Sequence, residues 1–476
     1  MGMKEKNRIE INKFNNFTDL SNPLAISFYN YLPTDKLYNS WGVETAKFPT
    51  TKESSTELEL NIADLDIAKI CGATYFKQYF ADTGVIQHRI LVYGDDKKVY
   101  INQLFDADPD LYWLYNLEFN SAPVTLVFKK DDADAIILTS TDKMVIWKTN
   151  YSPYTIEDVP IITSMCMNEG VLFCTIKEPA FKIWYATDLD AENVGNISSN
   201  SGYISLEDEL GDARKIVAFN ESVFVFRDYG ISKINYVKNE ATVSQVYLSN
   251  TKIFTNTVNV CGNVIIFMTK DGVYSFNGVK VTKTSVDIRD MLTDNNDSAV
   301  ASSLGNNYML ALKLDFKDDK TVLCEEGSYV NNAIVIVDIT DYSYQIIRGV
   351  DVQSLLPIKT EVFEKMIVTF NSGNVSKLGQ ITNNSSSFET PLPKYWVSGE
   401  LNKDYNVKLF TKLTVKADID VKFNLKYDDK NISFTTYKTG VNEFCFKICC
   451  KQIVLEISSS KAQAQVDNVI LDYYEY

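Results

Sequence analysis

The sequence is poor in the residues on which most catalytic and metal sites depend. It contains a single histidine, His88, and six arginines against 41 lysines. A Ser-His-Asp or Cys-His arrangement would have to use His88, which lies beside Arg89 at the edge of a predicted strand, and no G-x-S-x-G elbow is present. Metal sites built from several histidines are excluded for the same reason. We expect His88 to be structural or solvent-exposed, and we expect no catalytic, cofactor-binding or metal-binding residue.

A disulfide framework and a membrane span are also missing from the sequence. The eight cysteines, including the neighbours Cys449 and Cys450, match neither a close-spaced disulfide pattern nor a zinc pattern. We interpret them as reduced, mostly buried thiols. Residues 1–17 have no apolar core of a signal peptide, and no later run is long enough to span a bilayer. These features predict synthesis in a cytoplasm and no membrane insertion.

Excess positive charge is absent as well. The net charge is −15, and residues 386–476 are neutral, with 12 lysines and 12 acidic residues. Residues 1–385 therefore carry the whole imbalance, 35 basic against 50 acidic residues. Nucleic-acid-binding proteins concentrate Lys and Arg on one face, so the sequence predicts no sequence-specific binding of nucleic acid.

What the sequence does contain is a repeated pair of apolar runs. Blocks of four to seven Val, Ile, Tyr and Phe residues alternate with Asp, Asn, Gly and Lys, which is typical of strands and turns. The phrase ESVFVFRDYGISKINYV (221–237) returns as GNVIIFMTKDGVYSFNG (262–278). Seven equivalent first runs begin at Ile90, Ala135, Val171, Val223, Val264, Met309 and Met366, with steps of 45, 36, 52, 41, 45 and 57 residues. An insertion at 315–332 accounts for most of the longest step.

Repeats of this length, each with about four short strands, predict the blades of a β-propeller. Radial packing covers both faces of each sheet, which explains why the runs are continuously apolar. We predict an all-β fold with a six- to eight-bladed ring, seven blades being favoured, and we expect the repeated phrase to be the inner hairpin of each blade. A large unrelated β-sandwich assembly is the alternative, because the repeats match in pattern more than in letters.

Two regions lie outside the repeats. Residues 1–60 are rich in Asn, Pro and Ser and predict an extended N-terminal arm that wraps the propeller, residues 61–385, or docks on a partner. Residues 386–476 alternate polar and apolar residues, which indicates a C-terminal β-sandwich with one solvated face per sheet. Their neutral charge favours a separate domain.

Faint chemical signals remain in four places. The acidic turns DADPD (106–110) and DFKDD (315–319) allow a calcium site, although a solvated turn is the simpler reading. The stretch STDKMVIW (140–147) is close to the S-x-D-x-G-x-x-W turn of sialidase-like propellers, but Met144 replaces the glycine and arginines are few. The aromatics of DLYWLYNLEF (110–119) suit either stacking on sugar or the packing of an outer strand.

One long stretch, residues 158–234, resembles a recurring segment of bacteriophage virion propellers. The resemblance lies in the succession of WYATDLDAENV, a G-Y-I phrase, EDELGDARKIVAF and VFVFRDYGISKI. Similar proteins include the tail-hub or packaged-DNA-stabilisation proteins of short-tailed phages and tail-associated structural propellers. The chain departs from them at DAENVGN, where a tryptophan is common after the Asp.

The resemblance implies a non-enzymatic virion structural protein at the head–tail connector or tail hub, or along the tail. Its expected partners are portal, connector or tail proteins, in multiple copies forming a symmetric ring. Its expected role is assembly together with DNA retention or passage, and an acidic ring wall would let DNA slide without sticking. A tail-tip propeller that binds a receptor or a carbohydrate is the alternative, followed by a glycosidase and a cellular scaffold.

Overall fold

The computed structural model describes most of the chain, and almost all of what it describes is β-structure. The described residues are 6–12, 14, 27–29, 31–33, 37–39, 42–62, 67, 69–80, 82–130, 133–141, 143–147, 153–156, 159–187, 200–206, 208–237, 240–316, 326–382, 394–401, 406–461 and 464–475. The only helical pieces within these ranges are the 3₁₀ turns η2 (Arg289–Met291) and η3 (Glu326–Ser328). No helix in this part of the chain could cross a membrane.

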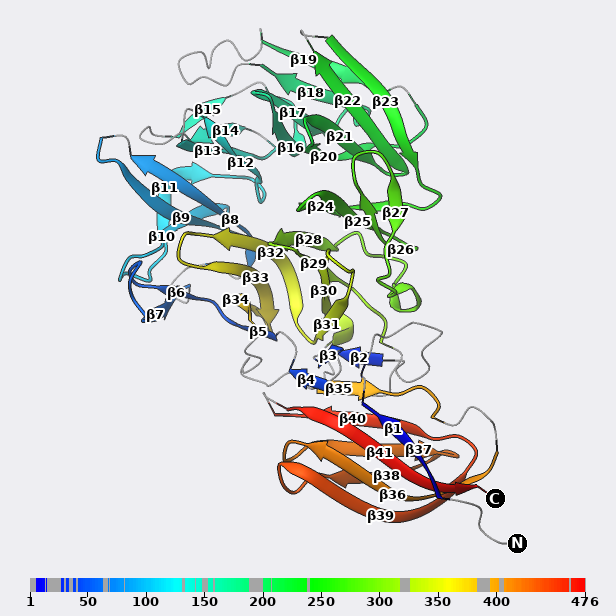
Figure 1. The fold of residues 1–476 in the computed structure, drawn as a ribbon. Coiled ribbons are helices and arrows are strands. Elements are labelled where there is room, and N and C mark those ends of the chain that lie inside the picture. The colour runs from blue at the N-terminus through cyan, green and yellow to red at the C-terminus, as the bar shows by residue number, and fades with distance from the viewer. Residues whose placement is uncertain are drawn as a thin grey trace.

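Seven four-stranded antiparallel sheets surround one axis as the blades of a propeller (Figure 1). Blades 1 to 3 contain β8 (Ile70–Phe80), β9 (Val85–Gly94), β10 (Lys98–Gln103), β11 (Tyr112–Glu118); β12 (Val124–Lys130), β13 (Ala133–Thr139), β14 (Met144–Trp147), β15 (Tyr154–Ile156); and β16 (Ile162–Asn168), β17 (Val171–Ile176), β18 (Lys182–Ala186), β19 (Ser201–Ser205). Blades 4 to 6 contain β20 (Ala213–Phe219), β21 (Ser222–Arg227), β22 (Gly230–Val237), β23 (Glu240–Leu248); β24 (Ile253–Cys261), β25 (Val264–Thr269), β26 (Gly272–Phe276), β27 (Val281–Lys283); and β28 (Val300–Leu304), β29 (Asn307–Leu312), β30 (Ala333–Asp338), β31 (Tyr344–Arg348). Blade 7 contains β32 (Asp351–Lys359), β33 (Glu364–Ser372), β34 (Val375–Thr382) and β5 (Gly42–Thr45).

The predicted propeller is therefore confirmed, with seven blades. Each of the seven expected first runs falls in the second strand of a blade, and each following run falls in the third. The repeated phrase is not the inner hairpin, as expected, but the middle one. In blade 4 the innermost strand is the preceding β20, and β21 and β22 lie in the centre of the sheet. The middle strands have a partner on each side and a neighbouring blade on each face, so they carry the strongest apolar signal.

Blade 7 closes the ring with strands that are distant in sequence. Its fourth strand, β5, pairs antiparallel with β34, with Val43 opposite Ile381. The Val43 side chain is 2% exposed and packs in the core of blades 6 and 7. Side chains reinforce this pairing, because Gln380 Nε2 donates to Glu44 Oε1 at 2.8 Å. A short hairpin of β6 (Lys47–Pro49) and β7 (Glu57–Glu59) follows β5.

The C-terminal domain is a sandwich of two antiparallel sheets. The first contains β1 (Lys6–Ile11), β3 (Tyr31–Pro33), β4 (Leu37–Asn39), β41 (Val466–Glu475), β36 (Lys408–Ala417) and β39 (Gly440–Cys450). The second contains β2 (Ser27–Tyr29), β35 (Lys394–Val397), β40 (Val454–Ser459), β37 (Lys422–Tyr427) and β38 (Lys430–Thr435). Four strands of the sandwich thus come from the N-terminal segment.

This arrangement corrects the expected division of the chain. Residues 1–60 do not form one extended arm, because β1 to β4 belong to the sandwich whereas β5 belongs to the propeller. Nor do residues 386–476 form a self-contained domain, since the whole of β1 pairs with residues 469–474 of β41. The physical reason is that a strand buried on both edges gains hydrogen bonds that an isolated arm would leave to water.

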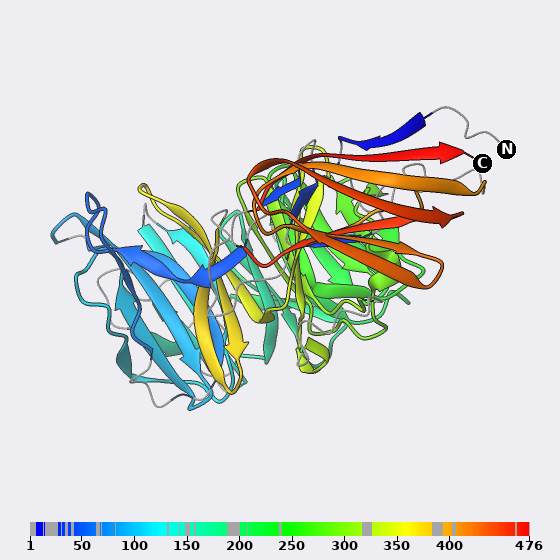
Figure 2. The same ribbon diagram turned by 90° about the horizontal axis from the view of Figure 1, so that it is seen from below.

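The sandwich packs beside blade 6, and the two share one apolar core. Figures 1 and 2 place β2, β3 and β35 between the body of the sandwich and this blade, and β2 and β3 contact β31. One buried cluster contains Tyr344 and Ile346 of blade 6 together with Phe14 and Trp396. The rings of Phe14 and Trp396 meet edge to face at 5.1 Å. The joint is therefore a continuous packed interior, which favours a fixed orientation of the two domains.

Candidate functional site

The innermost strands of the seven blades form the wall of a central channel. These strands are β8, β12, β16, β20, β24, β28 and β32, and neighbouring ones contact one another around most of the ring (Figure 1). Their sequences contain one acidic residue, Asp351, against six basic residues, Lys77, Lys129, Lys130, Arg214, Lys215 and Lys359. The expected acidic wall is therefore wrong. Inner strands crowd together at the axis and select apolar and small polar residues, so the acidic excess lies elsewhere.

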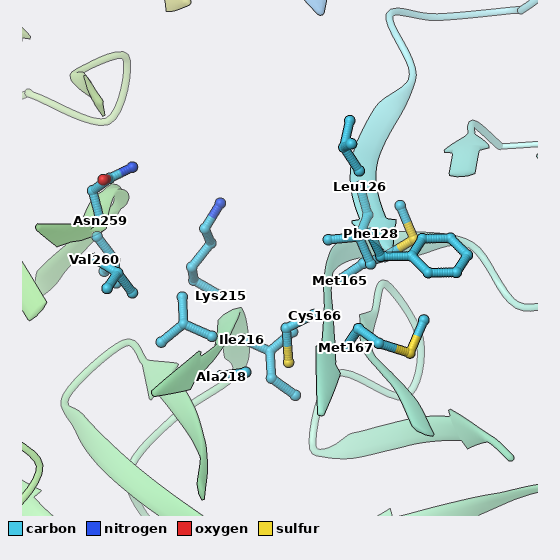
Figure 3. A pocket seen from close by; sticks show the side chains of 13 residues that line it. Leu126, Phe128, Met165, Cys166, Met167, Lys215, Ile216, Ala218, Asn259 and Val260 are labelled. Carbon is cyan, nitrogen blue, oxygen red and sulfur yellow. The ribbon is translucent and has the colours of Figure 1, made fainter. Parts of the chain in front are cut away.

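A cavity of about 570 Å³ opens in this channel between blades 2 and 5. Figure 3 shows apolar side chains around it, among them Phe128, Met165 and Met167. Lys215 is the only charged residue of its lining, and burial lowers the pKa of its ammonium group. Asn259, on the neighbouring inner strand β24, is the only amide side chain of the lining.

His88 lies at the junction of blades 1 and 7, where its side chain is 1% exposed. Its Nδ1 is 2.7 Å from the hydroxyl of Tyr75, and its Nε2 is 3.4 Å from Glu361 Oε2. Glu361 follows β32 of blade 7, and its Oε1 accepts a hydrogen bond of 2.5 Å from Lys52 Nζ. The histidine is structural, one of the two alternatives expected from the sequence.

The pKa values of Glu361 and His88 both shift in this cluster. The hydrogen bond from Lys52 and one from the backbone hold the pKa of Glu361 at about 2, so its carboxylate only accepts. Burial lowers the pKa of His88 against the opposing effect of Glu361, which keeps the imidazole neutral. The Tyr75 hydroxyl also donates to the carbonyl of Lys359 at 3.2 Å, so Tyr75 contacts blade 7 as well as His88. With the ring also edge-on to Phe105 at 5.2 Å, the arrangement joins two blades.

In the acidic turn at 106–110, the carboxylates accept hydrogen bonds from the backbone of the turn and from Asn61. Asp106 Oδ1 accepts from the Asp108 backbone N–H, and Asp108 Oδ1 accepts from that of Asp110 at 2.9 Å. Asp110 Oδ1 accepts from Asn61 Nδ2 at 3.1 Å. No cluster of three carboxylate, thiol or imidazole groups suited to a metal occurs in the described residues. Most of the second turn, residues 317–319, lies outside the described residues.

The aromatic stretch 110–119 lies mostly on β11, the outermost strand of blade 1. Leu117 and Phe119 are buried, as outer-strand packing predicts, but Tyr112 and Trp113 are 55% and 40% exposed. Lys98 Nζ lies 5.2 Å from the centre of the Trp113 ring.

The sialidase-like turn at 140–147 connects β13 to β14, with Ser140 N donating to Lys143 O at 3.1 Å. Met144 and Trp147 are buried, so the turn serves packing. Asp142 lies outside the described residues.

The cysteines that the structure describes are all free thiols. Four are buried and three are exposed: Cys166, Cys174, Cys261 and Cys450, against Cys71, Cys445 and Cys449. Burial raises the pKa of the Cys166 and Cys174 thiols, which keeps them protonated and unreactive.

Sequence reasoning missed a polar network in blade 4. Arg227 is 1% exposed, and its Nε and Nη2 donate to the carbonyl of Gly211 while its Nη1 pairs with Asp208. Gly211 has a φ of +86°, and a Cβ there would lie 2.8 Å from the side chain of Asp228. Arg214 Nε in turn donates to Asp228 at 3.2 Å. The sequence signal for this network is the acidic stretch EDELGD (207–212), which contains Gly211 and is followed by Arg227 in β21.

No family model matches the chain, and no curated protein does. Among solved structures, BBS1N in complex with ARL6DN is 11% identical, with 67% of this chain and 94% of that chain covered and a TM-score of 0.43. The N-terminal domain of Nup159 is 7% identical over 77% and 99%, with a TM-score of 0.40, and Kluyveromyces lactis Hsv2 is 9% identical over 55% and 82%, with a TM-score of 0.34. By its own sheet order, the chain is a seven-bladed β-propeller joined to a β-sandwich.

Proposed function

We propose that the chain is a non-enzymatic structural protein of a phage or phage-like particle. Its place would be the head–tail connector or tail hub, or a position along the tail. Its partners would be portal, connector or tail proteins, and it would act in several copies.

The observation that carries this proposal is the continuous body formed by the two domains. N-terminal strands enter both the sandwich and blade 7, and the cluster around Phe14 and Trp396 fills the joint. Such a body holds two separate surfaces at a fixed spacing, which suits a component that joins neighbours in an assembly. The surface of the sandwich farthest from the propeller is formed around β39, an edge strand with one unpaired side (Figure 1).

The resemblance to virion propellers supports the same proposal at the level of architecture. Its segment, residues 158–234, spans blade 3 and most of blade 4. The phrases EDELGDAR and FRDYG meet in the network of Arg227 and Asp228. These phrases therefore form part of a blade, which is the kind of feature that a family of structural propellers would share.

A role in DNA retention or passage would have to involve more than one copy. The cavity in the channel has the size of a small-molecule site, and the inner strands of adjacent blades touch around the axis. We infer that such a channel is too narrow for a DNA duplex. We propose that DNA would pass through an opening bounded by several copies in a symmetric ring.

A receptor- or carbohydrate-binding propeller at the tail tip is the second candidate, and one patch favours it. Tyr112 and Trp113 are exposed beside the acidic turn that contains Asp108, and Tyr112 donates to Asp108 Oδ2. Exposed aromatic rings next to carboxylates suit the stacking and hydrogen bonding of a sugar.

The first test is immunogold electron microscopy on particles purified from the host, with antibody raised against residues 386–476. Gold at the neck or along the tail supports the structural role, and mutants that leak packaged DNA then become the next readout. Gold at the tail tip favours the second candidate, for which Trp113→Ala should reduce binding to host cell walls while Tyr229→Ala, another exposed aromatic of the propeller, should not. Absence of the protein from particles, confirmed by mass spectrometry, contradicts both candidates.

A further inference from the structure

The cavity in the central channel has the chemistry of a ligand site. We propose that it binds a small organic anion with an apolar body, whose acidic group pairs with the ammonium of Lys215. This site is independent of the role of the protein in a particle.

The charge of Lys215 is the first argument. Lys215 lies in β20, and in the described part of the chain no carboxylate forms an ion pair or hydrogen bond with its Nζ. Figure 3 shows the side chain extended into the open part of the cavity, away from the strand. The lining contributes no negative charge, and burial lowers the pKa of the ammonium. Lys215 is half-buried, so its cation is partly desolvated without an anionic partner, and a bound anion would offset that cost.

The remaining lining is the second argument, because its residues other than Asn259 have apolar side chains. The lining includes Phe128 of β12 and Met165 and Met167 of β16, whose side chains also pack in the core between blades 2 and 3. Methionine side chains adjust to ligands of different shape. A volume of about 570 Å³ lies within the usual range of sites for small organic molecules. A small inorganic ion would leave this apolar surface in contact with water, so the anion should carry a hydrocarbon part.

The wall around the cation is held in place before any ligand arrives. The backbone N–H of Ile216, next to Lys215, donates to Ser164 Oγ of blade 3 at 3.2 Å. On the other side, Ser303 Oγ of blade 6 lies 2.7 Å from Asn259 Oδ1. Polar contacts between adjacent blades thus fix β20 and β24 on both sides of the site. A preformed wall lowers the entropic cost of binding.

The test uses the full chain and the fluorescent probe 8-anilinonaphthalene-1-sulfonate, which combines an anionic group with an apolar body. We expect one saturable site, with affinity reduced at least tenfold by Lys215→Gln. Lys233→Gln is the matched control, because Lys233 lies in the same blade, is half-buried and does not line the cavity. Ala218→Phe, which keeps the lysine and fills the apolar space, should also weaken binding.

Competition experiments test the charged group and the apolar body of the proposed ligand separately. Decanoate should displace the probe, whereas decanol, with the same chain and no charge, and acetate, with the charge and no chain, should not. Circular dichroism and thermal unfolding of each variant exclude a loss of fold as the cause. Equal affinity of the wild type and Lys215→Gln would overturn the proposal, as would displacement by decanol as efficient as by decanoate. Displacement by an acidic peptide but not by decanoate would overturn it too, since the channel would then be a peptide site.

Discussion

The propeller and the sandwich bury their sheets in different ways. In the blades, the middle strands are covered on both faces, and β25 and β29 each have five consecutive buried residues. In the sandwich, β36 and β39 instead alternate between more and less buried residues, because one face meets the other sheet and the other meets water. Radial packing thus removes the alternation that a two-layer sandwich keeps.

The two regions also differ in how far apart in sequence their partners lie. Blades 1 to 6 each form from one continuous segment, such as residues 213–248 for blade 4. The sandwich pairs Lys6 with Tyr474, at opposite ends of the sequence. Only blade 7, closed by β5, shares this long-range character. Blades formed from one continuous segment can fold early. The sandwich should form later, because pairing its distant segments requires the entropic cost of closing long loops.

The largest expected effect comes from removing the N-terminal strand. Deletion of residues 2–14 removes β1 and Phe14 but leaves β5 in place. Loss of a buried aromatic side chain alone costs about 3–5 kcal/mol, and β41 also loses its β1 partner. Hydrogen exchange should therefore increase across residues 394–475 while blades 2 to 4 stay protected. Phe181→Ala, at an exposed aromatic of blade 3, is the control and should change neither region. Equal loss of protection in the propeller would show that the two regions fold as one unit.

A change confined to one blade should have a smaller and local effect. Arg227→Met removes the cation that holds Asp208 and the carbonyl of Gly211, and breaking a buried polar pair of this kind costs about 3 kcal/mol. The free energy of unfolding of the propeller should fall. Amide hydrogen exchange should be faster at residues 208–212 and unchanged in the sandwich. Arg214→Met is the matched control. Because Arg214 is 49% exposed, its ion pairs with Asp212 and Asp228 should contribute at most about 1 kcal/mol. Similar losses in the two variants would contradict the role of Arg227.

The smallest expected effect concerns the long-range junction of blades 1 and 7. The pKa of Glu361 falls from 4.5 to about 2 on folding, so the unfolded chain binds more protons in this range. The contribution of Glu361 should be complete above about pH 4.5 and should be lost as the pH falls toward 2. Its side chain is 48% exposed, which limits the effect to below about 1 kcal/mol. Urea unfolding of wild type and Glu361→Gln should differ at pH 6, differ less at pH 3 and converge only near pH 2. A difference that stays constant with pH would refute this linkage.

Much of the fold can be predicted from the sequence because its signals are local. The seven apolar runs locate the second strand of every blade, and the runs that follow locate the third. The first and fourth strands of each blade, at the centre and rim of the ring, have weaker apolar patterns. The sequence therefore predicts the repeated hairpin one strand further inward than the structure has it. Of the candidate sites, His88 was predicted as structural or exposed, and its packing against Glu361 could not be seen, because 273 residues separate the two.

The sequence by itself determined that the chain is all-β, that its central part repeats seven times and that its last part follows a different pattern. Those properties depend on the order of apolar and polar residues within a few turns of chain. Tertiary structure alone decided that β5 closes the ring, that β1 to β4 complete the sandwich and that Lys215 faces an apolar cavity. These outcomes depend on which surfaces meet after distant segments have packed. Burial of apolar area stabilises these long-range contacts, but no single stretch of sequence specifies which segments will form them.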